Sequence, residues 1–300
     1  MLTRRLAEFV VDTRTRDIPA TVLQGSRYAL IDTLGCALAG TLEPAAELAV
    51  QWAQETGARA QATVWGRNLS TSPAEAAFAN GIAGHALDFD DSLPSLRGHP
   101  STTMAPAALA VGEVAGSSGE AVLAAFALGL EVAGKLGRAV GPAHYLRGWH
   151  TTATIGTFSA TAVAARLWGL NAAQLQSAWG LAASQVSGLV RNFGTMTKPF
   201  HAGHAARNGV LAAWMAHHDF TADDNIFDGN NNFFSTYGGS DGEPLADAGD
   251  RDVVPERPER RAGPGIDAVS VQYVKFRNEP AGCAVFGKRH VSDRYCRLPR

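Results

Sequence analysis

Apolar residues recur at three- and four-residue spacing along most of the first 220 positions, which is the period of packed helices. Helix-boundary residues support this pattern, because Ser72 and Pro73 can open one segment and Gly40 and Gly57 can close two others. A short β-like segment is predicted at 62–66. Helices are predicted over residues 3–13, 19–40, 43–57, 72–90, 101–116, 119–140, 152–169, 171–186 and 198–218.

The helical pattern is lost towards the C-terminus. Residues 227–239 read FDGNNNFFSTYGG, which predicts a loop, and residues 240–265 are rich in Pro, Gly, Asp and Arg without any period. The fold class expected is therefore mainly α. We divide the chain into an all-helical domain over 1–240 and an atypical Pro/Gly/Arg-rich tail over 241–300.

Composition narrows the class of protein. The chain is 46% hydrophobic and 18% charged, with a formal net charge of −2, which is typical of a soluble globular protein and gives no basic excess for nucleic acid. Glu131, Lys135 and Arg138 interrupt the longest apolar stretch, so we expect a buried helix there and no membrane span. Cys36, Cys283 and Cys296 are too few and too scattered for a disulfide framework. With no signal peptide expected at the N-terminus, a cytoplasmic location is the default.

Residues 85–101, HALDFDDSLPSLRGHPS, place Asp88, Asp90 and Asp91 where a helix should end. Carboxylates at a helix C-terminus are disfavoured by a few tenths to about 1 kcal/mol, so a cation, a metal or a proton should compensate them. A solvated acidic loop explains the three aspartates equally well. His99 follows closely, and a carboxylate in the same pocket would orient its imidazole.

Residues 195–209, TMTKPFHAGHAARNG, contain a candidate anion site. Pro199 fits the first turn of a helix, so the Lys198 ammonium should lie beside the free backbone N–H groups at the helix start. Arg191 adds a cation shortly before it. His201, His204 and Arg207 follow at three-residue spacing and are predicted to share one helix edge with Lys198. The alternative is a solvated basic stripe.

His150 precedes Thr151 and Thr152 at the start of another predicted helix. The dipole there favours the neutral imidazole, which can act as an acceptor or base, although packing beside Trp149 explains the residue equally well. Cationic and titratable groups at helix starts, with carboxylates opposite, indicate a small polyanion such as a di- or tricarboxylate. The matching chemistry is proton abstraction next to a carboxylate and acid-assisted loss of a leaving group.

Three segments resemble the MmgE/PrpD family: ANGIAGHALDFDDS with the later HPST, GWHTTATIGTFSATAVAARLWGL, and TMTKPFHAGHAARNGVLAA. The resemblance covers about residues 1–240. It implies a large helical domain with a smaller α/β lid, usually in a homodimer, and activity on citrate-like acids without an iron–sulfur cluster. No cofactor and no metal are therefore expected. The implied activity is that of a hydro-lyase of the 2-methylcitrate dehydratase type, in propionate metabolism, with decarboxylase or epimerase chemistry open within the family.

The resemblance places Asp90, His99, His150 and Lys198 in the active site. Lys198 would hold a carboxylate, the two histidines would move protons, and Asp90 would orient or charge a partner. Which histidine is the base stays open. Candidates for substrate binding are Lys198, His201, Arg191 and Ser101.

The tail departs from the family pattern, because no lid-like segment follows STYGG. We expect a degenerate remnant or an out-of-frame replacement of the lid, which would leave the pocket open to water and activity low or nil. Two other functions remain in view. One is a Mg²⁺-dependent all-α enzyme acting on a diphosphate, for which residues 217–225 offer a poor second carboxylate cluster. The other is a catalytically dead helical scaffold for dimerisation.

Overall fold

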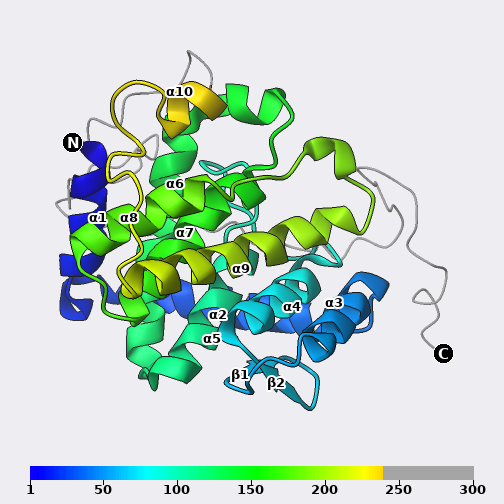
Figure 1. The fold of residues 1–300 in the computed structure, drawn as a ribbon. Helices are drawn as coiled ribbons and strands as arrows, with labels where there is room; N and C mark the ends of the chain where they lie inside the picture. Colours follow the sequence, from blue (N-terminus) through cyan, green and yellow to red (C-terminus); the bar gives the residue numbers. More distant parts are fainter. Residues whose placement is uncertain (239–300) are drawn as a thin grey trace.

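The computed structural model describes residues 1–238, which fold into ten α-helices, two 3-10 helices and one β-hairpin (Figure 1). The mainly α fold class is thereby confirmed. The elements are α1 (Leu2–Asp12), η1 (Thr15–Asp17), α2 (Ala20–Gly40), α3 (Pro44–Glu55), β1 (Ala62–Val64), β2 (Leu69–Thr71), α4 (Pro73–His85), α5 (Ser101–Ala115), α6 (Gly119–Leu146), α7 (Thr151–Leu167), α8 (Ala172–Ala183), η2 (Val190–Asn192), α9 (Thr197–His217) and α10 (Phe233–Tyr237).

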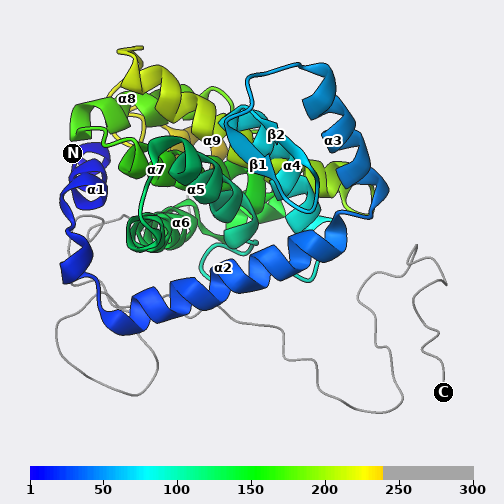
Figure 2. The same cartoon turned by 90° about the horizontal axis from the view of Figure 1, so that it is seen from below.

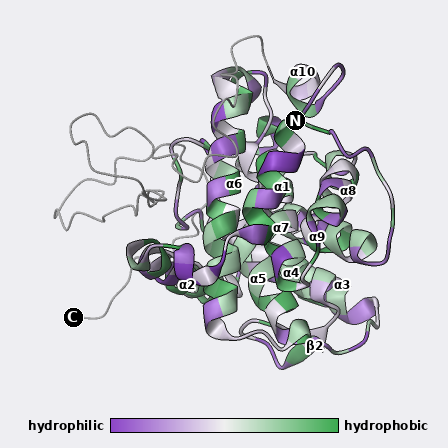
Figure 3. Ribbon diagram, turned by 90° about the vertical axis from the view of Figure 1, so that its left-hand side faces the viewer, coloured by the Kyte–Doolittle hydropathy of each residue, from purple (hydrophilic) through white to green (hydrophobic). Residues whose placement is uncertain are grey.

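Helices α4, α5, α7 and α9 form the centre of the domain. α9 packs along both α4 and α7, and α5 lies against α4 and α7 from the other side. α2 packs against α4, α5 and α6 and runs along the lower edge of the molecule in Figure 2, and α1 and α8 pack together at one end. Hydrophobic residues are prominent on the central helices in Figure 3. The core therefore lies around α4, α5 and α7, and the ends of these helices can hold a site.

Helix α7 is buried along its length from Thr151 to Ala165, although it carries several hydroxyl side chains. Some of these hydroxyls are satisfied within the helix, since Thr157 donates to the carbonyl of Ala153 and Thr161 to that of Thr157, both at 2.8 Å. Others bond to neighbouring segments, as Thr151 does to the carbonyl of Arg97. A polar helix can therefore occupy the centre without leaving unpaired groups. Its N-terminus, at His150, is held inside the protein.

Glycines set how closely α4 and α9 approach. A Cβ atom on Gly81 of α4 would lie 2.8 Å from the Cα of Gly203 in α9. A Cβ on Gly203 would lie 2.3 Å from the carbonyl oxygen of Phe78, nearer than any real contact. The two helices can cross this closely because both residues at the contact are glycines. The crossing sets α9 against α4, whose C-terminal end leads into the three aspartates at 88–91.

The local signals predicted most helix boundaries. Ser72 caps α4 by accepting the N–H of Glu75, and Asn171 and Gln174 form a reciprocal capping box at α8. The predicted strand is confirmed as β1, paired antiparallel with β2. α6 continues to Leu146, past its predicted end, across a break at Gly141 where φ is +67°.

One prediction for the C-terminal part of the chain is corrected, and another concerns residues outside those that the structure describes. Residues 227–239 are not entirely a loop, because Asn232 accepts the N–H of Ser235 and starts the short helix α10. The predicted tail over 241–300 lies outside the described residues. None of the helices within 1–238 combines the length and the apolar character needed to span a bilayer.

Candidate active site

The three aspartates follow the end of α4 in a tight turn, and each faces a different partner. α4 ends at His85, earlier than predicted, and Asp88 adopts a left-handed backbone with φ of 58°. The side chain of Asp88 is 55% exposed, whereas Asp90 and Asp91 are buried. We call residues 88–91 the acidic turn. It runs from solvent to the interior within four residues.

Asp90 pairs with a histidine from the last residue of α4. The Nδ1 atom of His85 lies 2.9 Å from both carboxylate oxygens of Asp90, and both side chains are fully buried. An ionised carboxylate can only accept, so Nδ1 of His85 carries the hydrogen. Burial disfavours the charge, but His85 and His99 outweigh it and hold the pKa of Asp90 below its ordinary value.

Asp91 turns the other way, towards the start of α5. Its carboxylate accepts the hydroxyl of Ser101 and, at 3.3 Å, the backbone N–H of Ser101. Burial raises the pKa of Asp91 to about 7, although the bonds from Ser101 oppose this rise. The side chain of Ser101, a predicted substrate contact, is therefore engaged by Asp91 and is completely buried.

Lys198 supplies the positive charge at the exposed end of the acidic turn. It is the second residue of α9, and its ammonium forms an ion pair with Asp88. His99 lies between two carboxylates, with Nε2 3.6 Å from Asp88 and Nδ1 3.5 Å from Asp90. The positive charge that the acidic sequence required is supplied by a helix start distant in the chain.

His150 forms the wall of the site at the start of α7. Its Nδ1 lies 3.1 Å from Nδ1 of His201, on the second turn of α9, and its ring packs edge-on against Phe193 at 4.7 Å. Burial, followed by the charges that His85, His201 and Lys198 can carry, lowers the pKa of His150 far below its ordinary value. The neutral imidazole was predicted, but burial rather than the helix dipole is the main cause. The predicted alternative, packing on Trp149, is not seen, since Trp149 stacks on His144.

These groups converge, because the ring of His85 lies 4.7 Å from that of His99 and 6.0 Å from that of His150. The structure therefore brings together four predicted residues: Asp90, His99, His150 and Lys198. Two further residues lie with them, His85 and Asp88, to which the sequence analysis assigned no catalytic role. The available signal for His85 was a titratable ring at the end of a helix made mostly of small and apolar residues.

Of the other residues predicted to bind substrate or to line the same helix edge, some lie at the site and some do not. His201 adjoins the site through His150, whereas Arg191 is exposed in η2 and forms no hydrogen bond or ion pair with any described residue. Arg207 was expected to share an edge with Lys198, but it pairs with Glu75 at 2.7 Å. Each residue of a helix advances about 100°, so nine residues place Arg207 on the opposite side from Lys198.

His85, Asp88, Asp90 and His99 each offer a ligand atom, and these atoms lie within 4.8 Å of one another. Their types suit a divalent transition metal. The Lys198 ammonium already neutralises Asp88, however, and a metal ion would have to displace it. The arrangement more directly favours an organic anion that accepts from Lys198 and the imidazoles.

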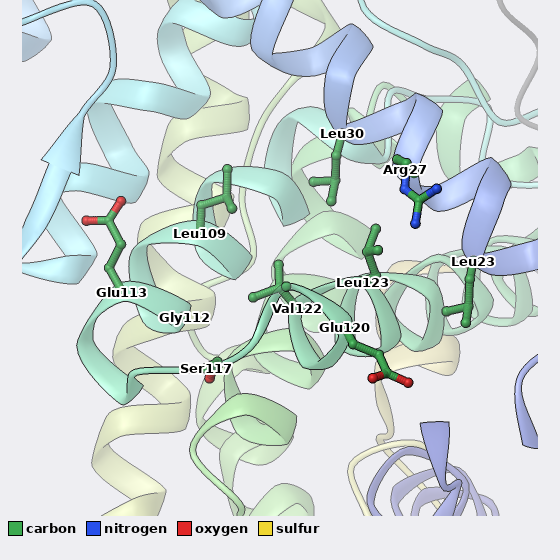
Figure 4. Close-up of a pocket in the computed structure, with 11 residues that line it drawn as sticks. Leu23, Arg27, Leu30, Leu109, Gly112, Glu113, Ser117, Glu120, Val122 and Leu123 are labelled. Carbon is green, nitrogen blue, oxygen red and sulfur yellow. The ribbon is translucent and has the colours of Figure 1, made fainter. Parts of the chain in front are cut away.

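A separate hollow of about 870 Å³ lies between α2, α5 and α6 (Figure 4). Leucine and valine side chains form much of its lining. Its one lining cation, Arg27, is outnumbered by Glu113 and Glu120. This balance does not suit a multiply charged acid, so the histidine–aspartate cluster remains the candidate site.

Comparison with known proteins identifies the family of this chain. The family model of the MmgE/PrpD N-terminal domain matches residues 4–244. Cis-aconitate decarboxylase of Homo sapiens is 31% identical over 221 residues, which are 72% of this chain and 46% of the human protein. A cis-aconitate decarboxylase-like protein of Aspergillus oryzae is 31% identical over 76% of this chain and 49% of its own length. The chain spans about half the length of the curated relatives it matches. It belongs to the MmgE/PrpD family, and the match lies in the family's N-terminal domain.

Proposed function

We propose that this chain carries the catalytic groups of a lyase that acts on citrate-like di- or tricarboxylic acids. The observation that carries the proposal is the convergence of Lys198, at the start of α9, with the imidazoles of His99 and His150. An ammonium beside free helix N–H groups binds a carboxylate, and two imidazoles in the same cluster can move protons on the adjoining carbons.

The environments of the two histidines support a different role for each. His150 is kept neutral by its buried surroundings, so it is the base in a reaction that begins with removal of a proton next to a carboxylate. His99 faces Asp88 and Asp90, which provide counter-ions for its protonated form, so it is the acid. Lys198 holds the carboxylate whose negative charge increases as the proton leaves.

Decarboxylation of cis-aconitate is the reaction we propose first, because the curated relatives are cis-aconitate decarboxylases. In this reaction the bond to one carboxyl carbon breaks and carbon dioxide leaves. The electron pair moves into the system conjugated with the remaining carboxylates, and an imidazole supplies a proton to carbon. Lys198 would stabilise the charge on the conjugated carboxylate.

Dehydration of 2-methylcitrate is the second candidate. The specific observation in its favour is the presence of two imidazoles in different environments, since elimination of water needs a base for the carbon-bound proton and an acid for the departing hydroxyl. In that reaction His150 would take the proton, the carbon–oxygen bond would break, and His99 would protonate the hydroxyl as it leaves.

The diphosphate alternative has less support. Asp223 and Asp224 were the poor candidates for a second carboxylate cluster, and both are exposed in the turn after α9. The carbonyl of Asp224 accepts from Gln176 of α8, so this turn lies against α8, whereas the acidic turn follows α4. A metal bridge between two carboxylate clusters is therefore not favoured within residues 1–238.

The test is incubation of the full chain with cis-aconitate, 2-methylcitrate and citrate, with and without a chelator. Released carbon dioxide and the ultraviolet absorbance of conjugated double bonds distinguish decarboxylation from dehydration. We expect chelator-insensitive turnover of at least one acid, and loss of turnover in His150→Gln. Failure of all three acids to bind by calorimetry would refute the proposed function, whereas turnover abolished by a chelator would favour the diphosphate alternative.

A further inference from the structure

The contact between His150 and His201 joins two ring nitrogens directly. Their Nδ1 atoms lie 3.1 Å apart, and both residues are buried, at 2% and 4% exposed. Two bare lone pairs would repel at this distance, and two N–H groups would clash. The contact must therefore hold one hydrogen between the rings, donated by one imidazole and accepted by the other.

Gly188 holds this pair in register. Its carbonyl accepts the backbone N–H of His150 at 3.0 Å, and its φ of +109° is a conformation suited to glycine. A Cβ at this position would lie 2.7 Å from the Cβ of Ala153 and 3.4 Å from Cγ of His201. The residue therefore packs between the start of α7 and the ring on α9, and both imidazoles have little freedom to separate.

We propose that His201 is the proton partner of His150 and carries the positive charge after His150 has removed a proton from substrate. In this step a new N–H bond forms at Nε2 of His150 while its Nδ1–H bond breaks. The released proton joins Nδ1 of His201, which already carries hydrogen on Nε2 and becomes an imidazolium. His150 remains neutral throughout. The inference deepens the dehydration reaction of the proposed function and rests on His150 acting as its base.

The surroundings favour charge on His201 over charge on His150. His150 faces His85 from α4, His99 after the acidic turn, and Lys198 and His201 from α9, and it also stands at the positive N-terminus of α7. His201 faces fewer such groups, chiefly His85 and the neighbouring His204. Burial and these two histidines lower the pKa of His201 only to about 4, whereas that of His150 falls much further.

This assignment revises the predicted role of His201. It was expected to bind substrate, but its Nδ1 faces the base. His204, one turn further along α9, has its Nε2 2.9 Å from the side-chain amide of Asn208 instead. The two histidines of the HAGH segment therefore have different hydrogen-bond partners, and His204 offers a matched control.

The first test is nitrogen NMR of the full chain with ¹⁵N-labelled histidine. We expect coupling between the two Nδ1 atoms across one shared hydrogen. On acidification the first charged ring of the pair should be His201. Charge that appears first on His150, or two Nδ1 atoms without coupling, would overturn the inference. This measurement uses no substrate, so it gives an answer even if the proposed function fails.

The second test compares two variants, if the chain turns over a citrate-like acid. Asparagine at 201 can hydrogen-bond His150 but cannot hold a proton, so His201→Asn should lower kcat about 100-fold with little change in KM, at the lower end of the usual range for proton-transfer groups. His204→Asn should retain the kcat of the parent chain. Full kcat in His201→Asn, together with an intact fold, would refute the relay while leaving the lyase assignment in place.

Discussion

The ammonium of Lys198, at the start of α9, forms an ion pair with Asp88, which stands at the exposed end of the acidic turn after α4. The lysine side chain is 15% exposed and the aspartate 55%. Asp88 therefore occupies, from within the protein, the position at Lys198 that a substrate carboxylate would take. A carboxylate that binds Lys198 must therefore replace the carboxylate of Asp88 in this ion pair.

Replacement of the lysine should separate binding from folding. We expect Lys198→Ala to weaken the binding of citrate about 10- to 100-fold, the size of a charge-assisted hydrogen bond lost. The free energy of unfolding should change by less than about 1 kcal/mol, because the partner carboxylate is half exposed. Calorimetric titration with citrate and urea unfolding check the two quantities, and parallel losses in both would make Lys198 structural.

Removal of the competing carboxylate should have the opposite effect on binding. Asp88→Asn keeps the size of the side chain but releases the Lys198 ammonium from its ion pair, so we expect citrate to bind about 3- to 10-fold more tightly. The gain should shrink as salt is added, since charges near the surface are screened. Unchanged or weaker binding in the same titration would show that Asp88 does not compete with the ligand.

His150 should be needed for chemistry and dispensable for binding. Glutamine at this position can neither accept a proton from carbon nor supply one to it, so His150→Gln should lower turnover at least about 100-fold, in line with the loss of a general acid or base. Citrate should still bind, because Lys198 and the α9 N-terminus remain. A variant that turns over cis-aconitate or 2-methylcitrate at the parent rate would remove His150 from the mechanism.

Asp91 should make stability depend on pH in a defined window. Its folded pKa of about 7 lies above the ordinary value of 3.8, so the folded chain holds a proton that the unfolded chain releases. Its contribution to stability is thus full below pH 3.8 and is lost as the pH rises to 7. In Asp91→Asn this loss should disappear. Urea unfolding at several pH values measures the difference, and parallel curves for both chains would contradict the prediction.

The glycine crossing should be sensitive to a single methyl group. Gly203→Ala drives a Cβ into the backbone of α4, and overpacking of this kind costs about 1 to 3 kcal/mol. Gly25→Ala in α2 is the control, because nothing lies within 4 Å of its added Cβ and helix propensity should raise stability by about 0.5 to 1 kcal/mol. Thermal unfolding of both variants tests the contrast, which equal melting temperatures would exclude.

The sequence by itself determined the helices, because caps, turn residues and apolar spacing act within a few residues of one another. Ser72, Asn171 and the glycines after helices were readable signals, and the boundaries mostly agree with them. Family membership and four members of the site, among them His150 and Lys198, could also be predicted, since their motifs are contiguous. The role of residues 241–300 stays a prediction.

Only the tertiary structure decided which groups meet. The left-handed backbone of Asp88 directs neighbouring aspartates to separate partners, and no local pattern showed that His85 would pair with Asp90. The pairing of His150 with His201 depends on how α7 and α9 lie beside each other. Contacts of this kind join residues that are distant in the chain, and their geometry follows from close packing between helices, which the order of residues along one helix does not contain.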